Sequence, residues 1–383
     1  MTQPDFMLTE ILEQPTILNS IFNDESLKSI AESIKAENYK NIILTGCGDS
    51  YCASWFGANL AKHWCIHYQV EYYEPFELVN YSNPKELKNT LVIGISVSGG
   101  TLRVLEAIRF AQYHGAVTLV ITDNSQGKLA KETNKKILIH ASPQESLLTT
   151  SYSSETAKKY VGYQNDVAQT KTYIANLGTL SVLFAYLSTQ SNSNLNKIKS
   201  AFSLVGKALD RRDEIIQVGR SLKDVSDSIF FVASGPDKPT GLFGAYKMFE
   251  FTLHGFSCDI EEFCHTRYFI TTNKSTVVLL TSDKQSYDRI MEIEPVLREN
   301  IKAKTIILAN KSLINENLTS ILPFTMPEDP YLSPLVQTIP IELLSYSLAR
   351  SKGFNTNTFR GGVETEKYVT GSYQTIRQSH LQF

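Results

Sequence analysis

The sequence predicts an α/β protein built of two similar αβα lobes, each a doubly wound parallel sheet, with an irregular C-terminal arm. Short runs of β-branched and aliphatic residues alternate with longer runs of helical spacing, which is the pattern of parallel sheets covered by helices. The same order begins again near residue 228. Phe56-Gly57-Ala58 follows Gly48 at the same spacing as Phe243-Gly244-Ala245 follows Gly235, which indicates a duplication.

The first lobe reads as strands joined by helices in the order of a doubly wound sheet. Strands are expected at 41–45, 91–95, 116–122 and 136–139, and helices at 51–64 and 102–114. Residues 173–187 read as a buried helix, because Asn176, Gly178 and Thr179 interrupt a run too short for a membrane span.

The second lobe repeats this order. Strands are expected at 228–233, 276–281 and 304–309, with a helix from about residue 240 and a long helix ending near Arg350. The polar stretch 188–200 is the expected connection between the lobes. We therefore divide the chain into an opening segment (1–27), a first domain (28–195), a second domain (196–350) and a C-terminal arm (351–383).

The composition excludes several classes of protein. The 383 residues hold 37 Lys and Arg against 39 Asp and Glu, so nucleic acid is not the expected partner. Apolar residues make up 42% of the chain, enough for a large core, and no run is long enough to span a membrane. Five cysteines and no visible signal peptide predict a cytoplasmic protein.

Two loops of the first lobe have the composition of an anion site. Each follows an expected strand and precedes a helix, where unpaired backbone N–H groups and the helix dipole attract negative charge. Ser96, Ser98 and Thr101 surround Gly99-Gly100, and Ser50 lies in the neighbouring loop. Neither loop has the P-loop or GxGxxG pattern, so ATP, NAD and other cofactors are not expected. These residues alone predict a binder of a small phosphorylated ligand, the alternative being that Ser and Gly only cap helices.

An ordered set of motifs resembles the isomerase half of glucosamine-6-phosphate synthase and its relatives with tandem sugar isomerase (SIS) domains, among them SIS-type glucosamine-6-phosphate deaminases. The similar segments, in chain order, are MLTEILEQP (7–15), GCGDSY (46–51), SVSGGT (96–101), VAQTK (167–171), GAYKMFE (244–250) and EFCH (262–265). The resemblance runs from residue 7 to about 355.

The resemblance implies a role for each matching position. Ser50, Ser96, Ser98 and Thr101 would hold a phosphate, with Val97 and Gly99 in the same loop. The residues that would line the sugar are Cys47, Gly48, Asp49, Val167 and Gln169. Glu250 would be the base that moves a proton between C1 and C2, Lys247 would tune it, His265 would assist ring opening from the partner subunit, and Lys367 is the nearest candidate for the family's tail lysine.

These residue types suit that chemistry. A proton beside a carbonyl or imine is moved by a carboxylate whose pKa is raised by burial, and ring opening needs a group that titrates near neutrality. The alternative for Lys247 and Glu250 is a surface ion pair, because they lie three residues apart on a helix. Cys258, Cys264 and His265 fit no standard zinc pattern, so no metal is expected.

The chain departs from the family pattern at several positions. Val97 and Gly100 replace polar residues of the phosphate loop, and Asp49 replaces a threonine. The His loop reads HTRY, in which Arg267 adds a charge. No glutaminase domain or N-terminal cysteine is present, so no glutamine hydrolysis is expected.

Three functions follow as hypotheses. The first is isomerisation and deamination of an amino-sugar phosphate, between glucosamine 6-phosphate and fructose 6-phosphate plus ammonia. The second is a deglycase that splits a fructosamine 6-phosphate, with Arg267 as the partner of a substrate carboxylate. The third is a phosphosugar-binding protein without catalysis. The resemblance implies a homodimer with a shared active site.

Overall fold

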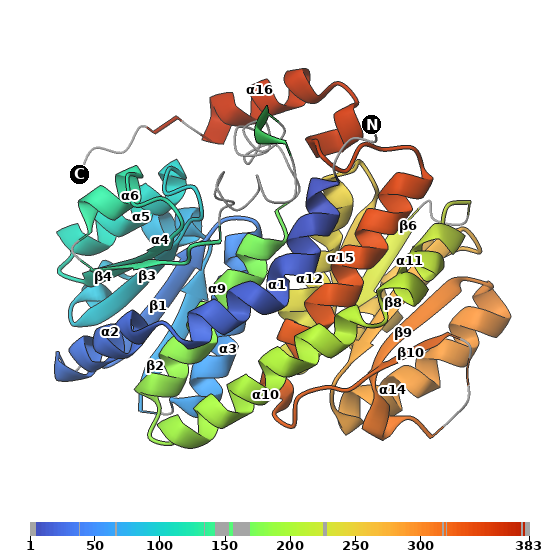
Figure 1. The fold of residues 1–383 in the computed structure, drawn as a ribbon, viewed down its shortest axis with the longest axis horizontal. Helices are drawn as coiled ribbons and strands as arrows, with labels where there is room; N and C mark the ends of the chain where they lie inside the picture. The colour runs from blue at the N-terminus through green and yellow to red at the C-terminus, as the bar shows by residue number, and fades with distance from the viewer. Residues whose placement is uncertain are drawn as a thin grey trace.

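Two five-stranded parallel sheets form the two lobes of the chain, as the computed structural model shows (Figure 1). It describes residues 5–37, 39–65, 67–133, 135–141, 153–155, 169–224, 228–315, 318, 320–376 and 378–379. The first sheet has the order β2-β1-β3-β4-β5 and the second has β7-β6-β8-β9-β10, so both lobes share one topology. The predicted duplication is therefore visible in the strand order.

The strands are short and lie at β1 Asn41–Gly46, β2 Gln69–Tyr73, β3 Thr90–Ile95, β4 Val117–Thr122, β5 Lys135–Leu138, β6 Ser228–Val232, β7 Gly255–Cys258, β8 Ser275–Thr281, β9 Lys304–Asn310 and β10 Ile321–Phe324. The central strands are buried along their whole length, because helices cover both faces of each sheet. The unpredicted strands β2, β7 and β10 all lie at sheet edges, where a strand needs no continuous apolar run.

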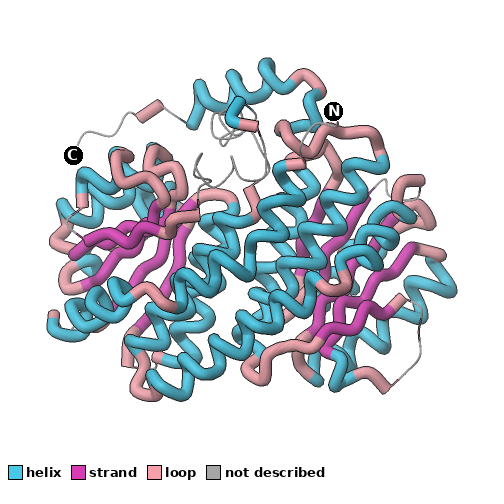
Figure 2. Tube along the Cα trace, viewed as in Figure 1, coloured by secondary structure: helices cyan, strands magenta, loops and turns pink. Residues whose placement is uncertain are grey.

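The α-helices lie at α1 Phe6–Phe22, α2 Glu25–Ala36, α3 Asp49–Trp64, α4 Pro75–Tyr81, α5 Leu102–Tyr113, α6 Lys128–Glu132, α9 Lys171–Leu187, α10 Ser191–Leu209, α11 Arg212–Ser221, α12 Lys238–Phe249, α13 Ile260–His265, α14 Lys284–Pro295, α15 Ser333–Ser351 and α16 Thr365–Ile376. Figure 2 shows the two sheets in magenta on either side of a layer of cyan helices. That layer contains α1, α9, α10, α12 and α15, and α12 of the second lobe packs on α3 of the first. The largest apolar core runs through this layer and joins the lobes.

Two connections are more regular than the sequence suggests. Most of residues 188–200, the expected connection between the lobes, belong to α10, which buries Asn194 and Ile198 and leaves most of its other polar residues exposed. The C-terminal arm is only partly irregular, since it contains the short helical turn Phe359–Gly362 and the helix α16, which crosses the top of the molecule in Figure 1. The boundaries expected at 27/28 and 195/196 fall inside α2 and α10.

Among the described residues, no helix combines the length and the apolar character that crossing a bilayer requires. In the same part of the chain, no group of three or more His, Cys, Asp or Glu side chains is arranged to hold a metal ion.

Candidate active site

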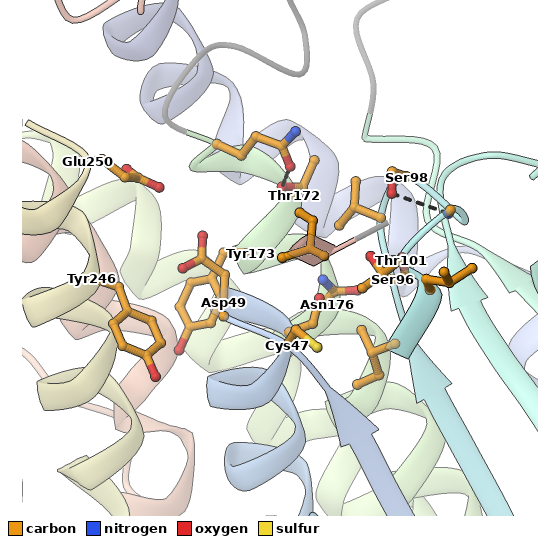
Figure 3. A pocket seen from close by; sticks show the side chains of 18 of the residues that line it. Cys47, Asp49, Ser96, Ser98, Thr101, Thr172, Tyr173, Asn176, Tyr246 and Glu250 are labelled. Atoms are coloured by element: carbon orange, nitrogen blue, oxygen red, sulfur yellow. Dashed lines mark hydrogen bonds between the residues drawn. The ribbon is translucent and has the colours of Figure 1, made fainter. Parts of the chain in front are cut away.

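A cavity of about 740 Å³ lies at the carboxyl ends of β1 and β3, where ligands bind in open α/β sheets. In Figure 3 the carboxylates of Asp49 and Glu250 lie on one side of it and Ser96, Ser98 and Thr101 on the other. The lining residues are Cys47, Gly48, Asp49, Ser50, Ile95, Ser96, Val97, Ser98, Gly100, Thr101, Leu102, Lys128, Gln169, Thr172, Tyr173, Asn176, Tyr246, Phe249, Glu250, Phe359 and Ile376. The structure thus brings both predicted loops and the predicted base to one cavity.

The phosphate loop joins β3 to α5 and presents hydroxyl groups beside a helix N-terminus. Ser96 Oγ lies 2.9 Å from Thr101 Oγ1, and Ser98 Oγ accepts the Gly100 N–H at 3.3 Å. Gly99 has φ +62°, and a Cβ there would lie 3.0 Å from Thr122 Oγ1 and 3.2 Å from the Gly127 Cα. The turn therefore needs glycine at this position.

The sugar loop joins β1 to α3 in the same way. Gly48 precedes α3 with φ +58°, and no side chain caps the first turn of the helix. No side chain caps the first turn of α5, so its first N–H groups remain available for an anion. At α3 the N–H groups of Ser50 and Tyr51 already donate to the carbonyls of Cys47 and Gly48. Lys128, at the start of α6, adds a cation to the lining that the sequence did not single out.

Cys47 is not set up as a nucleophile. Burial and, to a smaller extent, the carboxylate of Glu74, 3.8 Å from the sulfur, together raise the pKa of its thiol to about 12. The thiol therefore stays protonated and acts as a small lining group, as the sequence predicted.

Lys247 lies at the centre of a buried charge cluster between the lobes. Its side chain is 0% exposed, and its ammonium donates to Asp49 Oδ2 at 2.8 Å, Glu250 Oε1 at 2.7 Å and the Gln169 carbonyl at 3.1 Å. Burial alone would lower its pKa, but the carboxylates of Asp49 and Glu250 raise it above the ordinary lysine value. Lys247 is therefore a fixed cation and not a surface ion pair.

Glu250 follows the last residue of α12 and has the electrostatics of a general base. Burial raises its pKa, Lys247 lowers it and Asp49 raises it, with the net result at about 7. Its Oε2 is buried and has no hydrogen-bond partner among the described residues. A carboxylate with one oxygen held by a cation and the other open to a cavity can accept a proton from a ligand.

Helix α9 adds Thr172, Tyr173 and Asn176, which the sequence analysis did not select as site residues, to Gln169, which it did select. Gln169 precedes the helix, and Thr172, Tyr173 and Asn176 continue the same face at helical spacing. The Thr172 hydroxyl donates to Gln169 Oε1 at 3.1 Å. Polar residues at positions i, i+3, i+4 and i+7 of an otherwise apolar helix were the signal that could have identified this face.

The C-terminal arm covers the cavity beside Glu250. The Arg360 N–H donates to the Glu250 carbonyl at 2.6 Å, and Phe359 and Ile376 belong to the lining. The arm therefore contributes to the cavity through its backbone and apolar side chains.

Three residues singled out from the sequence, His265, Lys367 and Arg267, lie outside the lining of the cavity. His265 ends α13 with a side chain that is 78% exposed, and it lies outside the lining. Lys367 lies on α16 with a 70% exposed side chain, where it pairs with Glu364 instead of entering the cavity. Val167 falls outside the described residues. Arg267, in the turn Arg267–Ile270 after α13, also lies outside the lining.

Comparison with known proteins supports the resemblance drawn from the motifs. Residues 37–159 match the SIS domain. The glutamine–fructose-6-phosphate aminotransferase of Thermococcus kodakarensis is 29% identical over 364 residues, which cover 91% of this chain and 56% of that protein. The same enzyme of Bacillus subtilis is 26% identical over 372 residues, covering 92% and 56%. The chain thus spans about half the length of the curated relatives it matches.

Solved structures share the fold. The C-terminal domain of glucosamine-fructose-6-phosphate aminotransferase from Francisella tularensis gives a TM-score of 0.76 at 21% identity, covering 91% of this chain and 96% of that one. The glucosamine-6-phosphate deaminase of Thermotoga maritima gives 0.64 at 17% identity, covering 91% and 95%. The expected two-lobed α/β architecture and the resemblance to SIS proteins are both confirmed.

Proposed function

We propose that the protein interconverts an amino-sugar phosphate and a ketose phosphate, converting glucosamine 6-phosphate and water into fructose 6-phosphate and ammonia, or the reverse. One observation carries the proposal. Glu250 presents an unpartnered carboxylate oxygen, at a pKa near neutrality, to the cavity that also holds the hydroxyl-lined loop 96–101.

The two ends of the cavity suit the two ends of such a substrate. The phosphate would bind the hydroxyls of Ser96, Ser98 and Thr101 and the first N–H groups of α5, with Lys128 as a counter-charge. The carbon chain would then extend past Cys47 and Gly48, and C1 and C2 would reach Glu250.

The reaction is a proton transfer followed by hydrolysis. Glu250 Oε2 takes the proton from C2 of the open-chain aldehyde, and O1 takes a proton from solvent as the double bond moves to C1–C2. Return of the proton from Glu250 to C1 leaves an iminium at C2. Water then adds at C2 and the C–N bond breaks, which releases ammonia, returns one proton to solvent and leaves the ketose.

Lys247 would position the base, and Asp49 would contact the substrate. Lys247 stays charged, holds Glu250 Oε1 in place and thereby directs Oε2 toward the cavity. Asp49 places a second carboxylate beside the position of C2, where it suits an amino substituent or a sugar hydroxyl. This carboxylate favours an amino sugar over a neutral one.

A homodimer would complete the site. His265 lies outside the cavity of its own chain, and the exposed Phe269 and Ile270 follow it closely. An exposed histidine beside exposed apolar side chains suits a contact with a second copy, through which His265 would assist ring opening in the partner. Lys367 would reach the substrate only if α16 shifted, and it stays a prediction.

One observation favours a second candidate, a fructosamine-6-phosphate deglycase. The lining of the cavity, about 740 Å³ in volume, also includes the apolar side chains of Phe249, Phe359 and Ile376, which would suit an amine substituent larger than ammonia. If Arg267 binds a carboxylate on that substituent, Arg267→Ala should change the preference among substrate amines. An unchanged preference would remove this role.

The test is to incubate the protein with glucosamine 6-phosphate and measure ammonia and fructose 6-phosphate together. We expect equal release of both and a loss of about 10²- to 10⁴-fold in turnover for Glu250→Gln, with phosphosugar binding largely kept. Glu77→Gln, an exposed glutamate on α4, is the matched control. Undiminished turnover in Glu250→Gln would contradict the proposal.

The wild type could release neither ammonia nor fructose 6-phosphate while glucosamine 6-phosphate still raises its melting temperature. That result would leave the deglycase and the phosphosugar-binding protein as hypotheses. A panel of fructosamine 6-phosphates would then separate them, because a deglycase yields glucose 6-phosphate and a free amine. Binding without proton exchange at C1 or C2 would indicate a phosphosugar-binding protein.

A further inference from the structure

Asn176 is a buried polar residue whose position in α9 the proposed proton transfer does not explain. Its side chain is 1% exposed and lines the cavity, yet its Oδ1 has no hydrogen-bond partner among the described residues. A buried carbonyl oxygen without a partner destabilises a fold, and such groups are rare in native proteins. Other polar side chains of the helix, those of Lys171, Thr172 and Ser181, donate hydrogen bonds to Glu13, Gln169 and the Leu177 carbonyl. Asn176 Oδ1 and the neighbouring Tyr173 hydroxyl have no such partner among the described residues.

Asn176 lies between the two ends of the cavity. In Figure 3 its side chain lies beside Cys47 and Ser96, with Thr101 on one side and the carboxylates of Asp49 and Glu250 on the other. The amide therefore faces the middle of a ligand whose phosphate occupies the loop 96–101 and whose reacting carbons reach Glu250.

We propose that Asn176 binds a hydroxyl group in the middle of the substrate chain and so selects the configuration at that carbon. This inference rests on the proposed function and adds a specificity-determining residue to it. The middle of a hexose phosphate carries hydroxyls at C3, C4 and C5. A hydroxyl directed at Asn176 donates to Oδ1 and satisfies it, whereas the epimer directs the hydroxyl away and leaves the amide oxygen unpaired.

The selectivity follows from that unpaired oxygen. A site built to bind a hydroxyl discriminates strongly against a ligand that lacks it, because the buried polar group of the protein is then left without a partner. The apolar Tyr173 ring, stacked on Phe243 at 3.8 Å, packs beside Asn176 on the same helix and keeps this face rigid.

The test compares Asn176→Leu, which keeps the approximate volume but removes the amide, with the wild-type protein. Binding of fructose 6-phosphate, its C3, C4 and C5 epimers and inorganic phosphate is measured by calorimetry. Ser181→Ala, on the same helix but directed to the core through its bond to the Leu177 carbonyl, is the matched control. If the leucine variant fails to fold, the same binding measurements are made on Asn176→Ala.

We expect the wild type to prefer one epimer by about tenfold or more and Asn176→Leu to lose that preference. Affinity for inorganic phosphate should change by less than about twofold, because the phosphate loop is untouched. The unliganded variant should melt at the same temperature as the wild type or higher, since an unpaired buried oxygen has been removed. A structural role for Asn176 would instead lower the melting temperature.

Two outcomes would overturn the proposal, and they differ. If Asn176→Leu kept the wild-type ratio of affinities among the epimers, Asn176 would not set specificity although the phosphosugar function would stand. If the wild type bound none of the ketose phosphates, the proposed function would fall, and the assignment of Asn176 with it.

Discussion

The Lys247 ammonium binds one oxygen of the Glu250 carboxylate, at 2.7 Å, and leaves the other without a hydrogen-bond partner among the described residues. One oxygen is thereby fixed, and the other belongs to a side chain that lines the cavity. The proposed base requires such an arrangement, because an oxygen without a donor can accept a proton.

The first prediction concerns pH. Because the pKa of Glu250 is raised to about 7, its basic form is lost as the pH falls through neutrality, so kcat/KM for ammonia release should fall below about pH 7. Asp49 raises this pKa and Lys247 lowers it. Asp49→Asn should therefore move the acid limb of the profile to lower pH, and Lys247→Met should move it higher.

The measurement is the pH dependence of kcat/KM between pH 5 and 9 for both variants, with a ¹³C titration of the Glu250 carboxyl as a readout independent of turnover. Shifts in the same direction for both variants would contradict the assignment, because only opposite charges give opposite shifts.

Much of this site could be predicted from the sequence, because local chemistry defines it. The loops at 46–51 and 96–101 follow buried strands and hold the small hydroxyl residues that an anion needs, and both line the cavity. The contact between Asp49 and Lys247 could not be predicted. It joins residues from different lobes and exists only because α12 packs on α3.

The elements missed by the sequence share a physical cause. Edge strands such as β7 are short and half exposed, so they lack the apolar run that marked the central strands. Helix α16 lies in a stretch whose composition, rich in Gly, Thr and Asn upstream, is typical of loops. The sequence marks Asn176 only as an interruption of an apolar helix, because the loops 46–51 and 96–101 that share its cavity lie far from it along the chain.

The second prediction concerns the phosphate loop. Thr101→Val removes the hydroxyl that lies 2.9 Å from Ser96 Oγ and keeps the shape of the side chain. We expect affinity for inorganic phosphate and for fructose 6-phosphate to fall by about 10- to 150-fold, the equivalent of about 1.5–3 kcal/mol for a hydrogen bond to a charged group. Ser125→Ala, on an exposed loop residue, is the control. An unchanged phosphate affinity measured by calorimetry would place the phosphate elsewhere.

The third prediction concerns the stability of the second lobe. Asp237 precedes α12, is 0% exposed and accepts hydrogen bonds from Ser282 and Ser333. Burial raises its pKa to about 6, and these hydroxyls offset part of that effect. The folded state therefore favours the protonated form. Its contribution to stability is complete below about pH 4 and is lost as the pH rises to about 6.

Asp237→Asn keeps the shape and removes the ionisation. It should raise the melting temperature at pH 8, where the ionised carboxylate costs up to about 3 kcal/mol, and should have little effect at pH 4. Thermal unfolding at the two pH values tests this. Equal changes at both would show that Asp237 is not protonated preferentially in the fold.

The last prediction concerns the C-terminal arm. The Arg360 N–H binds the Glu250 carbonyl at 2.6 Å, and Ile376 of α16 lines the cavity, so the arm separates the carboxylate from water. A chain that ends at Val363 lacks α16 and should admit solvent to Glu250. Because burial is the largest cause of the raised Glu250 pKa, the acid limb of kcat/KM should move below pH 7 toward the ordinary glutamate value. Turnover should fall about tenfold or more, while affinity for inorganic phosphate should stay within about twofold, because the loop 96–101 is intact.

Phe359→Ala, which removes a single side chain from the same wall of the cavity, should shift the acid limb of kcat/KM in the same direction by a smaller amount. An acid limb that stayed near pH 7 in both variants would mean that the lobes alone, and not the arm, bury the base.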